Sequence, residues 1–136
     1  MTKSASRPLE KVAIVLVFLM ALLQGVYAIY AYSDPSAFSL LRGTELHDLA
    51  DADWVKIYAS RTLFVALIIG FLLYLKNYQI LAWAALFGTV MPIADAFLAY
   101  QAHAADIVVY KHIATVVYLL ITFAVLKVVV KNHPND

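Results

Sequence analysis

Four long apolar stretches dominate this 136-residue chain, and each is long enough to cross a lipid bilayer. They cover about residues 12–31, 57–75, 78–101 and 107–130, and a membrane helix requires roughly 17–25 residues. Only Lys76-Asn77 separates the second stretch from the third, so these two form an antiparallel hairpin. The sequence therefore predicts an all-α fold, an integral membrane antiparallel four-helix bundle in a single transmembrane domain.

The composition agrees with a chain whose main partner is the lipid bilayer. Hydrophobic residues make up 64% of the sequence and charged residues 14%, well outside the range of soluble globular proteins. The net charge of +1, without any large basic patch, argues against nucleic acid as a partner. The chain has no cysteine, which excludes disulfides, thiolate catalysis and sulfur metal sites.

Basic residues gather on one side of the predicted bundle. The side that carries both termini holds Lys3, Arg7, Lys11, Lys76, Lys127 and Lys131, with only two acids, Glu10 and Asp136. The opposite side holds Arg42, Lys56 and Lys111, with Arg61 just inside the second stretch, against most of the remaining acids, from Asp34 to Asp106. The positive-inside rule then predicts a multi-pass protein of the cell inner (plasma) membrane with both termini in the cytoplasm. The first apolar stretch is too long for a signal peptide, so we expect it to remain as a helix.

The outer loop, about residues 33–56, carries helix signals of its own. Asp34-Pro35 is a good start for a short helix, Gly43 can end it, and Thr44 can begin a further turn. We interpret the loop as a short interfacial helical segment anchored by Trp54. A lid over the outer mouth of the bundle is the alternative.

Each apolar stretch contains one polar or ionisable residue in its outer half: Gln24, Arg61, Asp95 and His112. At 1.5 Å per residue, Gln24 lies about 9–12 Å below the outer end of its helix, and Asp95 and His112 lie about 8–10 Å and about 8 Å deep. Arg61 is only about 5 Å deep, but its long side chain can reach further. Because polar groups in hydrocarbon are costly, we expect all four to point into the bundle.

Helical spacing supports that inward orientation. In the third stretch, Asp95 falls on a stripe of mostly small residues, which lets helices approach closely, and Pro92 is expected to kink the helix nearby. His112, Thr115 and Tyr118 share one face of the fourth stretch, and Gln24 and Tyr27 share one face of the first. We therefore predict a partly polar pocket. Its candidate catalytic residues are His112, Asp95 and Arg61, and its candidate ligand-binding residues are Gln24, Tyr27, Thr115, Tyr118 and Trp54.

Within this pocket we expect Arg61 to pair with Asp95, because a guanidinium lets a buried carboxylate keep its charge. His112 would then be free to exchange a proton near neutral pH. The alternative is that the three residues only lock the helix register. His47, His103 and Asp106 near the outer surface have no diagnostic spacing, and His112 is the sole intramembrane histidine, so we predict no metal and no other cofactor.

From about Asp34 onward, about three-quarters of the chain resembles the DUF4267 family of small membrane proteins of unknown function. The resemblance rests on Asp34-Pro35-Ser36-Ala37-Phe38, Ser60-Arg61-Thr62, Pro92-Ile93-Ala94-Asp95-Ala96 and Lys111-His112-Ile113-Ala114. The family's arginine is commonly followed by an acidic residue, where this chain has Thr62. The resemblance implies a four-helix fold and draws attention to Arg61, Asp95 and His112, but it implies no activity.

Two functions are consistent with these patterns. The first is a pocket, open to the outer side, for a small lipophilic ligand, with acid–base chemistry by His112 or Asp95 and stabilisation of negative charge by Arg61. The second is a non-enzymatic accessory subunit, in which small-residue stripes pack against another chain of a homo-oligomer or larger membrane complex. Transport is disfavoured because the inner half of the bundle offers almost no polar residue.

Overall fold

A computed structural model describes residues 3–132; Asp136, counted in the charge comparison, lies outside them. The described chain is helical: α1 Lys3–Ser33, α2 Pro35–Arg42, the short 3-10 helix η1 Leu49–Asp51, α3 Ala52–Tyr74, α4 Tyr78–Gly88, α5 Val90–Gln101 and α6 Asp106–Asn132. Four segments are long and apolar enough to cross a membrane, with α4 and α5 together forming the third. The predicted all-α membrane fold is confirmed.

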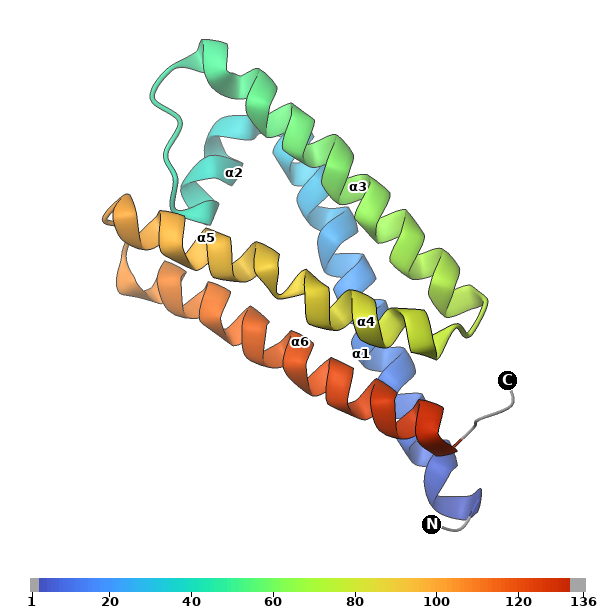
Figure 1. The fold of residues 1–136 in the computed structure, drawn as a ribbon. Helices are drawn as coiled ribbons and strands as arrows, with labels where there is room; N and C mark the ends of the chain where they lie inside the picture. The colour runs from blue at the N-terminus through green and yellow to red at the C-terminus, as the bar shows by residue number, and fades with distance from the viewer. Residues whose placement is uncertain (1–2, 133–136) are drawn as a thin grey trace.

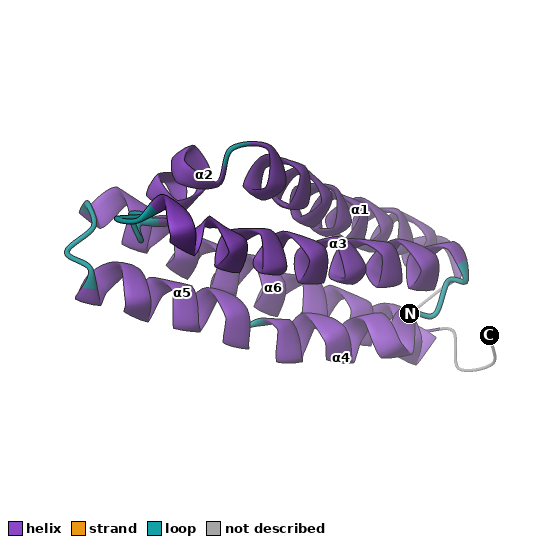
Figure 2. Ribbon diagram, turned by 90° about the horizontal axis from the view of Figure 1, so that it is seen from above, coloured by secondary structure: helices purple, strands orange, loops and turns teal. Residues whose placement is uncertain are grey.

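The four spans form two helix pairs (Figure 1). Consecutive spans run in opposite directions, and α3 packs mainly on α1 while α4 and α5 pack on α6. Contact between α1 and α6 joins the pairs, whereas α3 contacts α4 near their turn and makes little contact with α5. Figure 2 shows the same arrangement from above, with α2 lying across one end. We call this the loop end, and the end that carries Lys3 and Asn132 the terminal end.

The third span breaks between α4 and α5, close to the predicted kink. Helix α4 ends at Gly88, which lies four residues before Pro92. In a regular helix the N–H of residue 92 would donate to the Gly88 carbonyl. Proline has no N–H, and its ring clashes with that carbonyl, so the helix cannot run unbroken from Gly88 to Pro92. Thr89 lies at the break, and its hydroxyl donates to the Leu86 carbonyl at 2.7 Å. The expected kink is thus a division into two helices.

The loop-end segment confirms two of the predicted helix signals and corrects a third. Asp34 caps α2, its carboxylate accepting from the Ala37 N–H at 3.0 Å, and Gly43 ends the helix with a φ of 84°. Thr44 does not begin a turn; η1 follows Asp48 instead, whose side chain accepts from the Ala50 N–H at 2.9 Å. Helix α3 begins at Ala52 rather than near residue 57, because the chain re-enters helix directly from η1.

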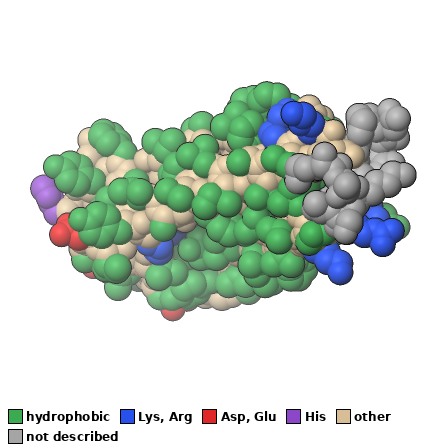
Figure 3. All heavy atoms as spheres, turned by 90° about the horizontal axis from the view of Figure 1, so that it is seen from below, with side chains coloured by type: hydrophobic (Ala, Val, Ile, Leu, Met, Phe, Trp, Pro, Cys, Tyr) green, Lys and Arg blue, Asp and Glu red, His purple; other side chains and the backbone are tan. Residues whose placement is uncertain are grey.

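Buried side chains form two separate clusters. The cluster toward the terminal end draws on four helices and contains Ala13, Val17, Met20, Ile69, Leu81, Ala82, Leu119, Leu126 and Val129. The cluster at the loop end draws only on α1, α2 and α3 and centres on Phe38, with Ala31 and Ala59. Apolar side chains also extend along the face seen in Figure 3, and Lys and Arg gather toward its right-hand end. The two helix pairs are therefore packed tightly together at only one end.

Candidate functional site

A cavity of about 880 Å³ lies between the helix pairs. Its walls are mostly apolar side chains of α1, α3, α4, α5 and α6. Its polar lining consists of Gln24, Tyr27, Arg42, Tyr58, Arg61, Thr62, Asp95, Lys111, His112, Thr115 and Tyr118. The structure thus brings together every candidate site residue that we derived from the sequence except Trp54.

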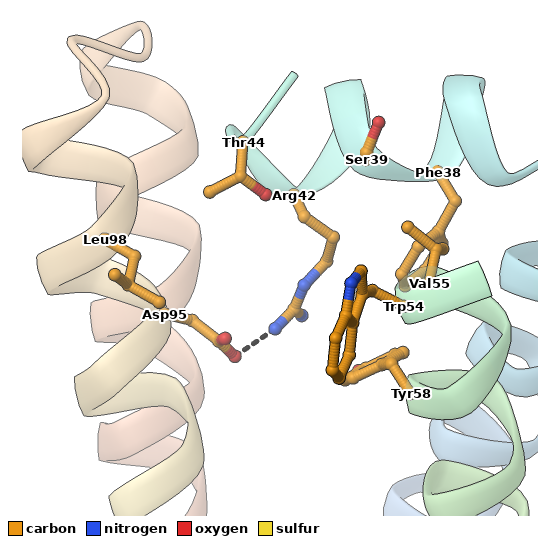
Figure 4. A pocket seen from close by; sticks show the side chains of 9 residues that line it. All are labelled: Phe38, Ser39, Arg42, Thr44, Trp54, Val55, Tyr58, Asp95 and Leu98. Carbon is orange, nitrogen blue, oxygen red and sulfur yellow. Dashed lines mark hydrogen bonds and ion pairs between the residues drawn. The ribbon is translucent and has the colours of Figure 1, made fainter. Parts of the chain in front are cut away.

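Trp54 lines a second, smaller cavity of about 220 Å³ at the loop end. Figure 4 shows this space between α2, the start of α3 and α5, with Trp54 beside Tyr58. Arg42, Tyr58 and Asp95 line both cavities and therefore form the wall between them. The indole itself is 72% exposed, so Trp54 belongs to the rim rather than to the interior.

The partner of Asp95 is Arg42, not Arg61, which corrects the pairing expected from the sequence. The Arg42 guanidinium reaches from the last turn of α2 to the Asp95 carboxylate on α5 (Figure 4). Its carbon lies 5.5 Å from the ring centre of Tyr27 and 5.6 Å from that of Tyr58. The end of α2 lies against α5 and α6, since a Cβ on Gly43 would be 3.1 Å from Ala99 Cβ and 2.8 Å from Val108 Cγ1, and Arg42 directly precedes Gly43. Helix α3, which carries Arg61, makes little contact with α5.

The surroundings of Arg42 keep its charge in place. Burial is the largest single influence and opposes the charged form, but Tyr58, Asp95 and Tyr27 together outweigh it, so the pKa of Arg42 is raised above its ordinary value. A group with a raised pKa contributes stability below its unfolded-state pKa and loses it only as the pH rises through the folded-state value. Arg42 therefore remains a cation at every pH at which the protein is handled.

His112 is buried and committed to the backbone of α2. Its Nε2 lies 3.2 Å from the Arg42 carbonyl oxygen, and the side chain is 2% exposed. Because a carbonyl only accepts, Nε2 must carry the hydrogen and donate it. The neighbouring Lys111 Nζ donates to the Leu41 carbonyl at 2.6 Å. These two side chains satisfy the last carbonyls of α2, which a helix leaves without partners.

The other polar side chains of the cavity differ in whether they already have a hydrogen-bond partner. Tyr118 donates to the Leu16 carbonyl at 2.5 Å, and Thr115 to the Lys111 carbonyl at 3.0 Å. Gln24 and Arg61, by contrast, make no hydrogen bond or ion pair with any residue in the range 3–132. Both have donors available to a molecule in the cavity.

Sequence reasoning missed Arg42 and Tyr58 because neither lies in the middle of an apolar stretch. A usable signal existed for Arg42. It is the only basic residue of a capped eight-residue helix and directly precedes the glycine that ends it. Such a residue must lie at the loop end of the bundle, within reach of the ends of several spans.

These features define a multi-pass α-helical membrane protein with a cavity that is polar at its loop end and apolar below. The chain belongs to the DUF4267 family, a domain of unknown function whose model matches residues 13–126. The match includes the first span, which the motifs noted in the sequence did not cover, and it contains Arg42, Arg61, Asp95 and His112. No curated protein and no solved structure matches the chain.

Proposed function

We propose that this protein binds a small lipophilic molecule inside the membrane, in the cavity between its two helix pairs. The observation that carries the proposal is the form of the cavity. Its volume of about 880 Å³ falls within the range of small-molecule sites, its walls are apolar, and a few polar groups gather at one end. Gln24 and Arg61 hold unused donors there, which a ligand would satisfy.

The ligand reaches the cavity sideways from the bilayer, between α3 and α5. Phe64 and Ile68 on α3 and Met91 on α5 line the cavity, yet they are 64%, 42% and 45% exposed. Because α3 makes little contact with α5, the cavity opens between these two helices. Because these three are apolar and lie midway along membrane spans, that opening faces acyl chains rather than water.

The geometry supports binding better than catalysis. Asp95 is held by the Arg42 guanidinium, and His112 donates Nε2–H to the Arg42 backbone. Acid–base chemistry on a bound molecule, with Arg61 beside a developing negative charge, would be left to His112 Nδ1 and to the second Asp95 oxygen, because the other atoms of these groups are engaged. Binding through Gln24 and Arg61 uses side chains whose donors are all available.

Our proposal places the protein in the plasma membrane with both ends of the chain in the cytoplasm. The terminal end carries Arg7, Lys11, Lys76, Lys127 and Lys131, whereas the loop end carries Arg42, Lys56 and Lys111 together with the acids Asp34, Glu45, Asp48, Asp51 and Asp53. This asymmetry favours a cytoplasmic terminal end. The polar end of the cavity then lies in the outer leaflet.

Mass spectrometry of lipid extracts from the purified protein tests the binding proposal. The informative variant is Gly88→Leu. Gly88 lines the cavity, and a Cβ there lies 3.9 Å from Leu119 Cδ1 and 4.0 Å from Met91 Cε, so a larger side chain begins without a clash and should take up cavity space. The matched control is Gly25→Leu, where a Cβ meets no atom within 4 Å and the residue does not line the cavity.

We expect a small molecule to co-purify with the native chain and with Gly25→Leu, and to be lost from Gly88→Leu. Identical extracts from all three proteins would overturn the proposal. In that case an accessory role, with the protein packed against another membrane chain, would be the better explanation.

A further inference from the structure

The charges around the large cavity are unbalanced. Three cationic side chains line it, Arg42, Arg61 and Lys111, against a single carboxylate, Asp95. Within residues 3–132, the only ion pairs are Arg42 with Asp95 and the exposed Asp53 with Lys56. Two positive charges at the polar end of the cavity therefore have no acidic partner from the protein.

The two cations that have no acidic partner in the described part of the chain, Arg61 and Lys111, favour the binding of an anionic ligand in the cavity. Charged groups in a membrane span are costly unless they pair with opposite charge, and an anionic group on a ligand would supply it. Arg61 suits this role because a guanidinium presents several N–H donors in a plane, a geometry that matches carboxylate and phosphate oxygens. Lys111 contributes positive charge nearby, while its ammonium is held by the Leu41 carbonyl.

Away from its charged end, the cavity accepts a hydrocarbon chain. Leu19, Leu23, Ile68 and Ile69 belong to its walls on the α1–α3 side, and Leu119 to its wall on α6. The volume of about 880 Å³ is enough for one long hydrocarbon chain. The opening between α3 and α5 lets such a chain enter from the bilayer with its head near the loop end.

We propose that the ligand is a single-chain lipid with an anionic head, a carboxylate or a phosphate, bound by Arg61 with Arg42 and Lys111 close by. This inference rests on the proposed function, because it names the chemical class of the molecule in the same cavity. Gln24 donates a further hydrogen bond to the head. A neutral or cationic head would leave the excess positive charge uncompensated or would add to it.

Binding of matched chains to the purified protein in detergent tests this inference. The probes are hexadecanoate, hexadecyl phosphate and hexadecanol, which share a 16-carbon chain and differ in the head, and native mass spectrometry measures the bound fraction of each. The variant is Arg61→Gln, which removes a charge that no described residue pairs. Its control is Lys56→Gln on the same helix, a lysine that does not line the cavity.

We expect one or both of the anionic probes to bind at least tenfold more tightly than hexadecanol, since a hydrogen bond between charged groups is worth about that factor. Arg61→Gln should remove most of this preference, and Lys56→Gln should leave it unchanged. The two anionic probes distinguish a carboxylate site from a phosphate site.

Three results would overturn the inference, and a fourth would overturn the proposed function itself. Hexadecanol binding as tightly as the anions, while Gly88→Leu still blocks it, would refute the anionic head and keep the lipophilic cavity. Displacement of hexadecanoate by an equal concentration of phosphatidylglycerol would refute the single chain. If no probe binds while a molecule still co-purifies with the native chain, the ligand is not a single-chain lipid. If Gly88→Leu changes neither the probe binding nor the extracts, the cavity is not a ligand site.

Discussion

The two ends of this bundle hold their helices together by different means. At the terminal end, apolar side chains from α1, α3, α4 and α6 meet in one cluster around Leu81 and Leu126. At the loop end, the apolar cluster around Phe38 reaches only α1, α2 and α3. The link to α5 and α6 there passes through α2: Arg42 pairs with Asp95, the last helix carbonyls accept from His112 and Lys111, and Gly43 lies close to Val108.

This difference explains where the cavity lies. In a bilayer, close packing rather than the hydrophobic effect draws helices together, because acyl chains solvate apolar side chains equally well. Where small and medium side chains fit closely, as at the terminal end, the spans converge. Where the eight-residue α2 stands between the helix pairs, they stay apart and leave a space beneath it. At the loop end, the polar contacts of α2 with α5 and α6 close that space from above.

The largest effect is expected from Asp95→Ala, which removes the ion pair between Arg42 and Asp95 at the loop end. Removing the carboxylate leaves the Arg42 guanidinium unpaired, at a cost of about 3 kcal/mol in the free energy of unfolding, the lower end of the range for a buried pair because Asp95 is 28% exposed. Unfolding in mixed detergent micelles measures this. Asp53→Ala, which removes the exposed partner of Lys56, is the control and should cost almost nothing.

A double variant sharpens the same test. Arg42→Leu with Asp95→Leu removes both charges at once, so it should cost less than Asp95→Ala alone. An equal or larger loss for the double variant would mean that the side chains matter for their shape, and that the loop end is not held by charge.

Leu81→Ala tests the terminal end and should cost about 2 kcal/mol in the free energy of unfolding. This cost comes from the cavity that the buried leucine leaves behind. No transfer free energy is added, because lipid solvates the side chain equally well when the helices separate. The control is Leu67→Ala, because Leu67 is 63% exposed on the outer side of α3, and its free energy of unfolding should hardly change. Ligand binding should survive Leu81→Ala. A loss of binding as large as that caused by Gly88→Leu would contradict the separation of the two ends.

Gly43→Ala should be slightly milder, about 1–2 kcal/mol, because the backbone at a φ of 84° disfavours any side chain. The new Cβ would also lie 2.8 Å from Val108 Cγ1 and 3.1 Å from Ala99 Cβ, which forces α2 away from α5 and α6. Hydrogen exchange should quicken across residues 35–42 while the terminal end keeps its protection. Gly25→Ala meets nothing and, as the better helix former, should stabilise slightly.

The same two ends show how far the sequence could be interpreted. Periodicity and depth placed Gln24, Arg61, Asp95 and His112 on inward faces, and these four side chains do line one cavity. Local chemistry also located both ends of α2, because Asp34 and Gly43 are sufficient signals on their own. Pattern along a helix is a local property, and these predictions needed nothing more.

The partner of Asp95 could not be predicted in that way. It depends on the direction in which α2 leaves α1, which is set by tertiary contacts such as the close approach of Gly43 to Val108. The start of α3 was misplaced for a related reason, since η1 joins it without a break and the polar residues before Trp54 hide the helix. Short polar segments carry little periodicity, so their course follows from docking.

The smallest effect is expected from Asp34→Ala, about 1 kcal/mol in the free energy of unfolding, the usual cost of a lost N-cap. Asp34 holds only the first turn of α2, through the Ala37 N–H, and does not line either cavity. The Ala37 amide should therefore exchange faster while the Arg42–Asp95 pair persists, and Asp34→Asn should restore the cap. If Asp34→Ala instead cost as much as Asp95→Ala, the intrinsic stability of α2 would hold the loop end together, and the ion pair would be only its consequence.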